Sequence, residues 1–167
     1  MRNFSFLLSL FLLVACGFEP VYGDLGSKTE YTAVETRLSQ VEIAAIPDRN
    51  GQYLRNALID RLYPHARPGT AAYTLSVSTI EERHTDLDIT KSSDATRRQI
   101  RLLTKLTLTD RKTGAAVLDR DLSAIGSYNI LGSEFTNRVS EQNARENALN
   151  DLAQQIELQL GLYFQRQ

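Results

Sequence analysis

Apolar and polar residues alternate in four runs along the chain, which is the pattern of a strand with one buried face. The runs span residues 40–46, 72–80, 97–110 and 118–128. Their predicted inward-facing residues are Val41, Ile43 and Ala45; Tyr73, Leu75 and Val77; Ile100, Leu102, Thr104, Leu106 and Leu108; and Leu118, Leu122 and Ala124. The polar segment Asp110 to Gly114 has the length of a turn between antiparallel neighbours. The sequence therefore predicts four strands, of which the last two form a hairpin.

Residues 51–62 repeat apolar side chains every four positions, as the buried stripe of a helix does. The stripe consists of Leu54, Leu58 and Leu62. Pro64 is expected to end this helix, because a proline disfavours helical geometry in the residue before it. Asp48 or Asn50 is expected to cap the first turn with its side-chain oxygen.

A longer helix is predicted from Glu134 to Phe164, a segment without proline. Its apolar stripe consists of Ala144, Ala148, Leu152, Ile156 and Leu160. The order strand, helix, three strands, helix predicts the α+β class. Two helices would pack on one face of a four-stranded, mostly antiparallel sheet and form a two-layer sandwich. Residues 81–96, between the second and third predicted strands, are expected to form a loop.

The first fifteen residues have the pattern of an export signal. Arg2 provides the positive charge, and the apolar stretch from Phe4 to Val14 is too short to span a bilayer. Ala15 and Cys16 complete a lipobox at the end of this stretch. We therefore expect residues 1–15 to be removed and Cys16, the only cysteine of the chain, to carry a lipid anchor.

Lipidation of Cys16 would hold the protein on a membrane without a transmembrane helix. Residues 16–39 show no sustained apolar period, so they are interpreted as a tether, and residues 40–167 as one folded domain. Gly17, rather than an acidic residue, follows the cysteine, which favours location in the outer membrane.

The remaining composition gives little sign of catalysis. The chain has 19 Lys and Arg against 20 Asp and Glu, a balance that does not suit nucleic-acid binding. His65 and His84 belong to no spacing typical of metal or catalytic sites, and neither a cofactor nor a metal ion is expected. Two acidic pairs, interpreted as solvated surface groups, are Glu81 with Glu82 and Asp86 with Asp88. A lipid-anchored hydrolase that uses one of the histidines is the enzymatic alternative.

A row of basic residues is the one surface feature that suggests a ligand. Arg97, Arg101 and Lys105 project from the strand face opposite the apolar set, with roughly 13 Å between successive members. Lys91 and Arg98 lie near the entry to that strand. Such a row either binds the phosphates or sugar acids of an anionic ligand, or is a solvated face that discourages aggregation. The residues alone leave both interpretations open.

Several motifs together resemble a known family. The segment after the lipobox reads Cys16-Gly17-Phe18-Glu19-Pro20-Val21-Tyr22-Gly23, which resembles the Cys-Gly-Phe-x-Pro-x-Tyr-Gly start of one branch of the LptE family of lipopolysaccharide-assembly lipoproteins. The resemblance covers essentially the whole chain after residue 15. Its further motifs, in order, are Leu54 to Leu58, Tyr73 to Leu75, Arg97 to Asp110, Thr113-Gly114, Ser127 to Asn129 and Ala148 to Tyr163.

The resemblance implies a non-enzymatic protein seated in the lumen of a large outer-membrane barrel, LptD. There it would act as plug and assembly factor while lipopolysaccharide passes to the outer leaflet. By matching position, the resemblance implies that lipopolysaccharide is bound by Lys91, Arg97, Arg98, Arg101 and Lys105. An auxiliary lipoprotein of a lipid-trafficking ABC transporter is the alternative that the sequence leaves open.

Overall fold

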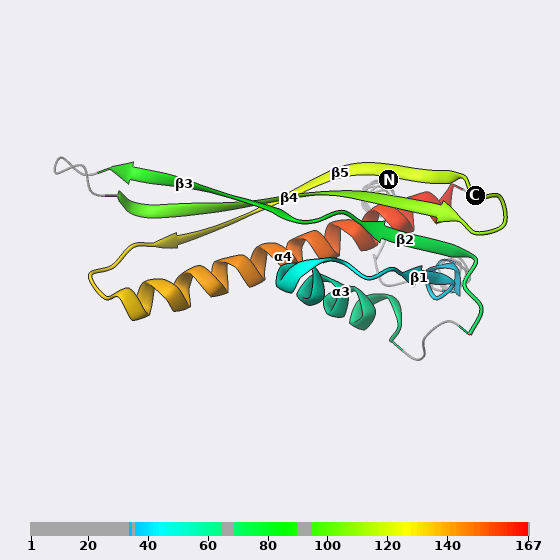
Figure 1. The fold of residues 1–167 in the computed structure, drawn as a ribbon, viewed down its shortest axis with the longest axis horizontal. Coiled ribbons are helices and arrows are strands. Elements are labelled where there is room, and N and C mark those ends of the chain that lie inside the picture. The colour runs from blue at the N-terminus through cyan, green and yellow to red at the C-terminus, as the bar shows by residue number, and fades with distance from the viewer. Residues whose placement is uncertain (1–33, 35, 65–68, 90–94, 167) are drawn as a thin grey trace, which may run out of the picture. The chain divides into compact units, whose positions relative to one another are not determined.

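The computed structural model of the protein describes residues 34, 36–64, 69–89 and 95–166. Its main elements follow in the order strand, helix, four strands, helix (Figure 1). They are β1 (Val41–Ile43), α3 (Asp48–Leu62), β2 (Tyr73–Val77), β3 (Glu81–Ile89), β4 (Ala95–Asp110), β5 (Ala116–Asn129) and α4 (Glu134–Gln165).

β4 is the central strand of the sheet. β5 pairs antiparallel with it along one edge, over nearly its whole length. β2 and β3 follow each other along the other edge of β4, with β2 opposite Leu106–Asp110 and β3 opposite Ala95–Leu103. β1 extends the sheet beyond β2 as a parallel neighbour. β4 is therefore the shared partner of three strands.

β3 occupies residues that were expected to form a loop, so the sheet has five strands and the prediction of four was wrong. After β2 the pairing is interrupted at residues 78–80, where the Ser78 N–H still donates to the Lys105 carbonyl at 2.9 Å. The strand alternation of β3 is hidden in the sequence because its inward-facing residues are polar. These residues are Glu82, His84 and Asp86, opposite Leu102, Ile100 and Arg98.

β1 is shorter than predicted. It ends at Ile43, so Ala45 is exposed, and the chain buries Ile46 instead. Ile46 packs against the first turn of α3, where a Cβ on Gly51 would lie 2.7 Å from Ile46 Cγ2. The absence of a side chain at Gly51 therefore lets β1 connect to α3 within a few residues.

α3 begins three residues earlier than predicted and lacks a side-chain cap. Pro47 is its N-cap residue, with no hydrogen bond from a capping side chain, so the prediction of Asp48 or Asn50 as the cap was wrong. The Asn50 amide instead donates to Glu82 at 3.3 Å. At the other end, α3 stops at Leu62, two residues before Pro64, as expected.

Both helices pack on the same face of the sheet (Figure 1). The predicted inward sets of β2, β4 and β5 lie on this face, and apart from the partly buried Tyr73 they are buried. The predicted stripes of α3 and α4 are also buried, with Leu54, Leu58, Leu152, Ile156 and Leu160 fully inaccessible to solvent. This interface forms the hydrophobic core, and it confirms the two-layer α+β class with two helices on one face.

α4 approaches the sheet closely where it crosses β5. A Cβ on Gly126 would lie 2.2 Å from the Ala144 carbonyl oxygen, a distance that no side chain tolerates. Glycine at position 126 therefore sets the separation of helix and strand here. The next residue of α4, Arg145, is consequently held next to the sheet.

The turn between β4 and β5 has the predicted residues. The Asp110 carboxylate accepts from the N–H groups of Lys112 and Thr113, and Gly114 adopts a φ of 72° that suits glycine. None of the described helices combines the length and apolarity needed to cross a membrane.

The expected signal peptide lies outside the described residues, and the domain boundary at residue 39 stays a prediction. The last residues before it, 36–38, are helical. The Arg37 guanidinium donates to the Phe164 carbonyl at 3.0 Å, and Leu38 packs against the core.

Candidate functional site

The sheet has one face without the described helices α3 and α4, which we call the open face. It carries the odd-numbered residues of β3, β4 and β5, because these lie opposite one another in the strand register. Arg97, Arg101 and Lys105 are all exposed on this face, as their shared parity predicted, and their binding of a ligand stays a prediction. Arg83 of β3 lies beside Arg101 and adds a fourth basic residue that the sequence did not single out.

The charges of the open face differ in their pairing. Lys105 forms an ion pair with Asp119 at 3.0 Å, which raises the pKa of the lysine. Arg83 pairs with Glu81 at 3.1 Å. Among the described residues, Arg97 and Arg101 have no ion-pair partner. These two guanidiniums are therefore the ones most available to an anionic ligand.

Arg98 lies on the opposite face of β4 from Arg97 and points towards α4. Its Nε donates to Asp86 at 2.5 Å, and a further hydrogen bond joins it to Tyr128. These contacts raise the pKa of Arg98, while the guanidinium lowers the pKa of the Asp86 carboxyl. The sequence grouped Arg98 with the basic row, but the structure places it on the other face of β4.

Two residues of the predicted set, Cys16 and Lys91, lie outside the described residues.

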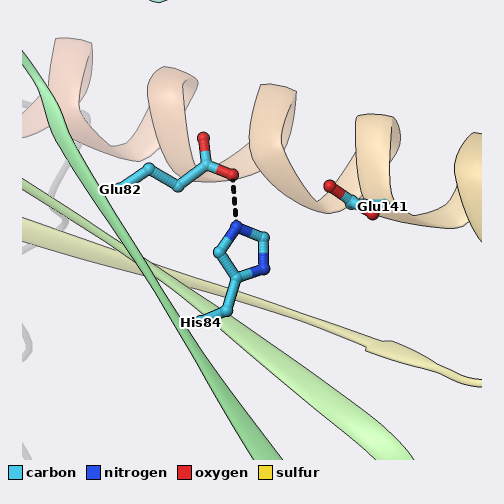
Figure 2. Close-up of side chains that lie close together, drawn as sticks. All are labelled: Glu82, His84 and Glu141. Carbon is cyan, nitrogen blue, oxygen red and sulfur yellow. Dashed lines mark hydrogen bonds and ion pairs between the residues drawn. The ribbon is translucent and has the colours of Figure 1, made fainter.

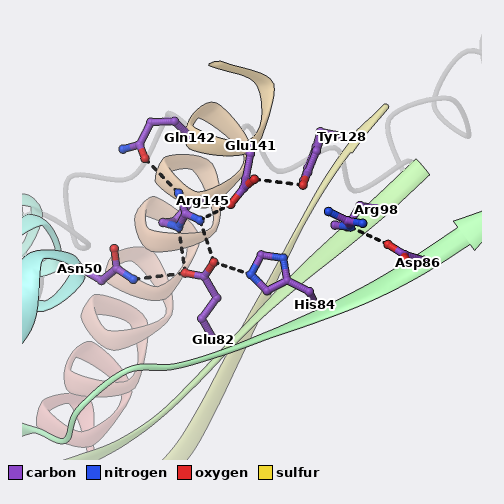
Figure 3. A network of polar contacts seen from close by, with 9 residues as sticks. All are labelled: Asn50, Glu82, His84, Asp86, Arg98, Tyr128, Glu141, Gln142 and Arg145. Atoms are coloured by element: carbon purple, nitrogen blue, oxygen red, sulfur yellow. Dashed lines mark hydrogen bonds and ion pairs between the residues drawn. The ribbon is translucent and has the colours of Figure 1, made fainter. Parts of the chain in front are cut away.

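A second polar site lies between β3 and α4, and we call it the Arg145 network (Figure 3). The Arg145 guanidinium makes paired hydrogen bonds of 2.8 Å to both carboxylate oxygens of Glu82, and a bond of 2.6 Å to Glu141 one turn earlier on α4. The side chains of Arg145 and Glu82 are each only 18% exposed. The Arg145 network consists of Asn50, Glu82, His84, Tyr128, Glu141, Gln142 and Arg145.

The network connects three elements through one carboxylate. Glu82 of β3 accepts from Arg145 of α4, from the Asn50 amide of α3, and forms a 2.8 Å contact with the His84 ring. The hydrogen bonds from Arg145 lower the pKa of Glu82 against the opposing effect of its burial, and they raise the pKa of Arg145. A bidentate arginine in a partly buried position is a strong and directional contact.

Glu82, His84 and Glu141 also approach one another in a way that could suggest a metal site (Figure 2). One ligand atom from each lies within 4.8 Å of the others. However, a single nitrogen of Arg145 donates to Glu82 at 2.8 Å and to Glu141 at 2.6 Å. The guanidinium thus occupies the space between the two carboxylates and offsets part of their negative charge, so a metal cation would have to displace it.

The Arg145 network was not predicted from the sequence. Glu82 was interpreted as a solvated acid, and both Glu82 and His84 were expected in a loop, whereas both lie within β3 and bond to each other. One signal was available. Arg145 directly follows Ala144 of the buried stripe of α4, whereas residues 81–86 are polar at every position and show no strand alternation.

Comparison with known proteins identifies relatives among lipoproteins. A protein from Caulobacter crescentus CB15 assigned as a lipoprotein shares 26% identity and a TM-score of 0.64, with 80% of this chain and 96% of that one covered. A minor lipoprotein from Acinetobacter baumannii shares 27% identity and a TM-score of 0.53, with 73% and 88% covered.

A more distant structure shows the fold alone. The rare lipoprotein B from Shewanella oneidensis is 10% identical, with a TM-score of 0.54, over 70% of this chain and 89% of that one. A search of curated proteins finds no match. The family model described as LptE, lipopolysaccharide-assembly, matches residues 38–160, which include all the described strands and most of α4. The chain therefore belongs to the LptE family of lipopolysaccharide-assembly proteins.

Proposed function

We propose that this protein is an outer-membrane lipoprotein, anchored through Cys16, that plugs the LptD barrel and assists its assembly for insertion of lipopolysaccharide into the outer leaflet. The family match over residues 38–160 is the observation that carries the proposal. The lipobox and the lipoproteins among the similar structures support the anchor.

The role requires a stable body rather than a reactive group. The apolar core along α4 supplies a firm two-layer body. The open face presents Arg97 and Arg101 to solvent without an ion-pair partner among the described residues, and their guanidiniums suit the phosphates of lipopolysaccharide. Arg98 and Lys105 already have acidic partners, so they would contribute less unless a ligand displaces those partners. Lys91 completes the proposed ligand set.

A pull-down from the native outer membrane tests the partner. The tagged full-length protein would be captured in mild detergent, and its partners identified by mass spectrometry. We expect one large barrel protein in near-equal amount. Recovery of ABC-transporter components without a barrel would contradict the proposal and favour an auxiliary lipoprotein of a lipid transporter.

Membrane fractionation tests the anchor. Cys16→Ala removes the only thiol that can be lipidated. We expect this variant to accumulate as a precursor in the inner membrane. The anchor assignment would fail if the variant fractionated with the outer membrane as the wild type does.

Lipopolysaccharide binding can be tested separately for the two faces of β4. We expect Arg97→Ala combined with Arg101→Ala to weaken binding of purified lipopolysaccharide, because both charges are exposed and neither pairs with an acid in the described part of the chain. Arg98→Ala should have a smaller effect on binding, because that guanidinium is bonded to Asp86. Arg49→Ala, at an exposed arginine of α3, is the control. Equal binding by the double variant and the control would show that Arg97 and Arg101 do not bind lipopolysaccharide and belong to a solvated face.

A further inference from the structure

Three arginines among the described residues are partly buried rather than exposed, and they differ in how their charge is balanced. Arg98 and Arg145 both form ion pairs with carboxylates. Arg55 of α3 is the third, and it has no ion-pair partner within the described part of the chain. Because a guanidinium that loses water without gaining an acid destabilises the folded state, the position of Arg55 calls for an anion.

The hydrogen bonds of Arg55 do not compensate for the missing acid. Its Nη2 donates to the Ile43 carbonyl at 3.4 Å, which is longer than the usual range of about 2.7–3.2 Å. Its Nε has neither access to solvent nor a hydrogen-bond partner in the described structure. A buried donor without a partner is unfavourable. An anion close to this side chain would neutralise the charge, and a small rotation would let Nε donate to it.

Arg55 lines a pocket between β1, α3 and the segment that precedes β2. The volume of this pocket is about 290 Å³, close to the lower limit of roughly 300 Å³ for ligand pockets, so it suits one small group rather than a whole lipid. Its polar lining residues are Glu42, Arg55, Tyr63 and Arg111. Two guanidiniums thus face one carboxylate, and the lining has a net positive charge.

Arg111 reaches the pocket from the turn after β4. Its backbone N–H donates to the Ala72 carbonyl at 3.0 Å, which fixes the turn beside the start of β2. Its guanidinium pairs with Glu42 at 2.6 Å, but the two side chains are 50% and 55% exposed. Because an ion pair this exposed contributes little stability, Arg111 can turn towards an anion at small cost.

We propose that this pocket binds a phosphate group through Arg55 and Arg111. A phosphate offers at least three acceptor oxygens, enough for the forked donors of two arginines, whereas a carboxylate has only two oxygens. Inorganic phosphate and the monoester head group of a lipid share this chemistry. The pocket is separate from the basic row, because Arg97 lies near the start of β4, roughly 40 Å along the strand from Arg111.

Thermal melting of the full-length, lipidated protein in a phosphate-free detergent buffer tests the site. Inorganic phosphate is added at constant pH and ionic strength, so that screening of the surface charges does not change. At about ten times its dissociation constant, phosphate should raise the melting temperature of the wild type by roughly 3–6 °C. Arg55→Met keeps the apolar stem but removes the charge, and this variant should lose the rise.

Arg111→Met provides a second measurement if Arg55→Met fails to fold, because Arg111 is exposed in a turn. We expect this variant to bind phosphate at least about tenfold more weakly, since it loses charge-assisted hydrogen bonds. Arg49→Met, at an exposed arginine of the same helix as Arg55, is the matched control and should respond as the wild type does. An equal rise in the wild type and both pocket variants would overturn the proposal, as would no rise in the wild type.

Glycerol 3-phosphate, a soluble monoester head group, distinguishes the two sources of phosphate. Tighter binding than that of inorganic phosphate, with the same dependence on Arg55, would assign the pocket to a lipid head group. Equal or weaker binding would assign it to free phosphate. Neither result depends on the barrel partner, which the pull-down tests independently.

Discussion

The two halves of α4 contact the rest of the domain in different ways: the C-terminal half through apolar packing and the N-terminal half through ion pairs. The C-terminal half packs against the sheet and α3 through Leu152, Ile156 and Leu160, which are fully buried. The N-terminal half meets β3 through Arg145, whose guanidinium bonds to Glu82 and Glu141. The boundary between them lies near Ala148, the last fully buried small residue before the leucines begin.

This difference indicates how each half responds to its surroundings. Apolar burial depends little on salt or pH, and it forms the cooperative core. An ion network depends on the protonation of its carboxylates and on the exact partners present. The end of the domain at β3 should therefore open more readily than the leucine-packed end.

The largest effect is expected from a charge in the apolar half. Leu152→Asp places an unpaired carboxylate where solvent has no access, which should lower the free energy of unfolding by at least about 3 kcal/mol, out of a typical total of about 5–15. Thermal melting followed by circular dichroism measures it. Leu158→Asp, at a residue that is 58% exposed on the same helix, should stay within about 0.5 kcal/mol of the wild type. Similar melting temperatures of the two variants would mean that the face of α4 assigned as buried is wrong.

A methyl group at the crossing of α4 and β5 should come next. In Gly126→Ala the new Cβ would meet the Ala144 carbonyl at 2.2 Å, so the helix must shift, at about 1–3 kcal/mol. Chemical denaturation measures the change. Gly132→Ala adds the same methyl group where no atom lies within 4 Å and should be nearly neutral. Equal stability of the two variants would contradict the close packing.

Removal of the Arg145 guanidinium from the N-terminal half of α4 should lower stability by a similar amount, but only locally. Arg145→Ala leaves the partly buried Glu82 and Glu141 carboxylates without their shared partner, which should lower stability by about 1–3 kcal/mol. Hydrogen exchange should accelerate in β3 and hardly change at Leu106 and Leu108. Arg138→Ala removes an exposed pair with Glu134 and should change almost nothing. Uniform acceleration across the sheet would show that the two halves are not separable.

The smallest expected effect is the pH dependence of the stability that Glu82 contributes. Hydrogen bonds from Arg145 hold the pKa of Glu82 below its ordinary value of 4.5. The ionised carboxylate therefore contributes stability that is present above pH 4.5 and lost as the pH falls through the lowered pKa. The melting temperatures of the wild type and Glu82→Gln should converge as the pH is lowered from 7 towards 3. A constant difference over this range would contradict the assignment.

The apolar half was predictable from the sequence and the polar half was not. The stripe from Ala144 to Leu160 and the alternation from Ile100 to Leu108 report burial directly, because each apolar side chain records its own environment. In β3 the partly buried, inward-facing Glu82 depends on Arg145 for its ion pair. That dependence on a residue 63 positions away leaves no local pattern to read.

The basic row shows the same limit. Parity along β4 correctly placed Arg97, Arg101 and Lys105 on one face. It could not show that Asp119 already pairs with Lys105, or that Arg98 belongs with Asp86 on the other side. Which charges remain available to a ligand depends on neighbouring strands, and the register of those strands appears only in the folded chain.

The central position of β4 also bears on the order in which the domain assembles. β2, β3 and β5 each pair with β4, and the described strands show no pairing among these three. β3 and β5 both pair with β4 close to it in the sequence, with Ile89 opposite Ala95 and Thr109 opposite Ala116, so we expect these three strands to pair early. β2 pairs with the far end of β4, at Leu106–Asp110, and β1 joins the sheet only through β2. We therefore expect the domain to nucleate around β4 and to add β2 and β1 last, although these two strands are made first.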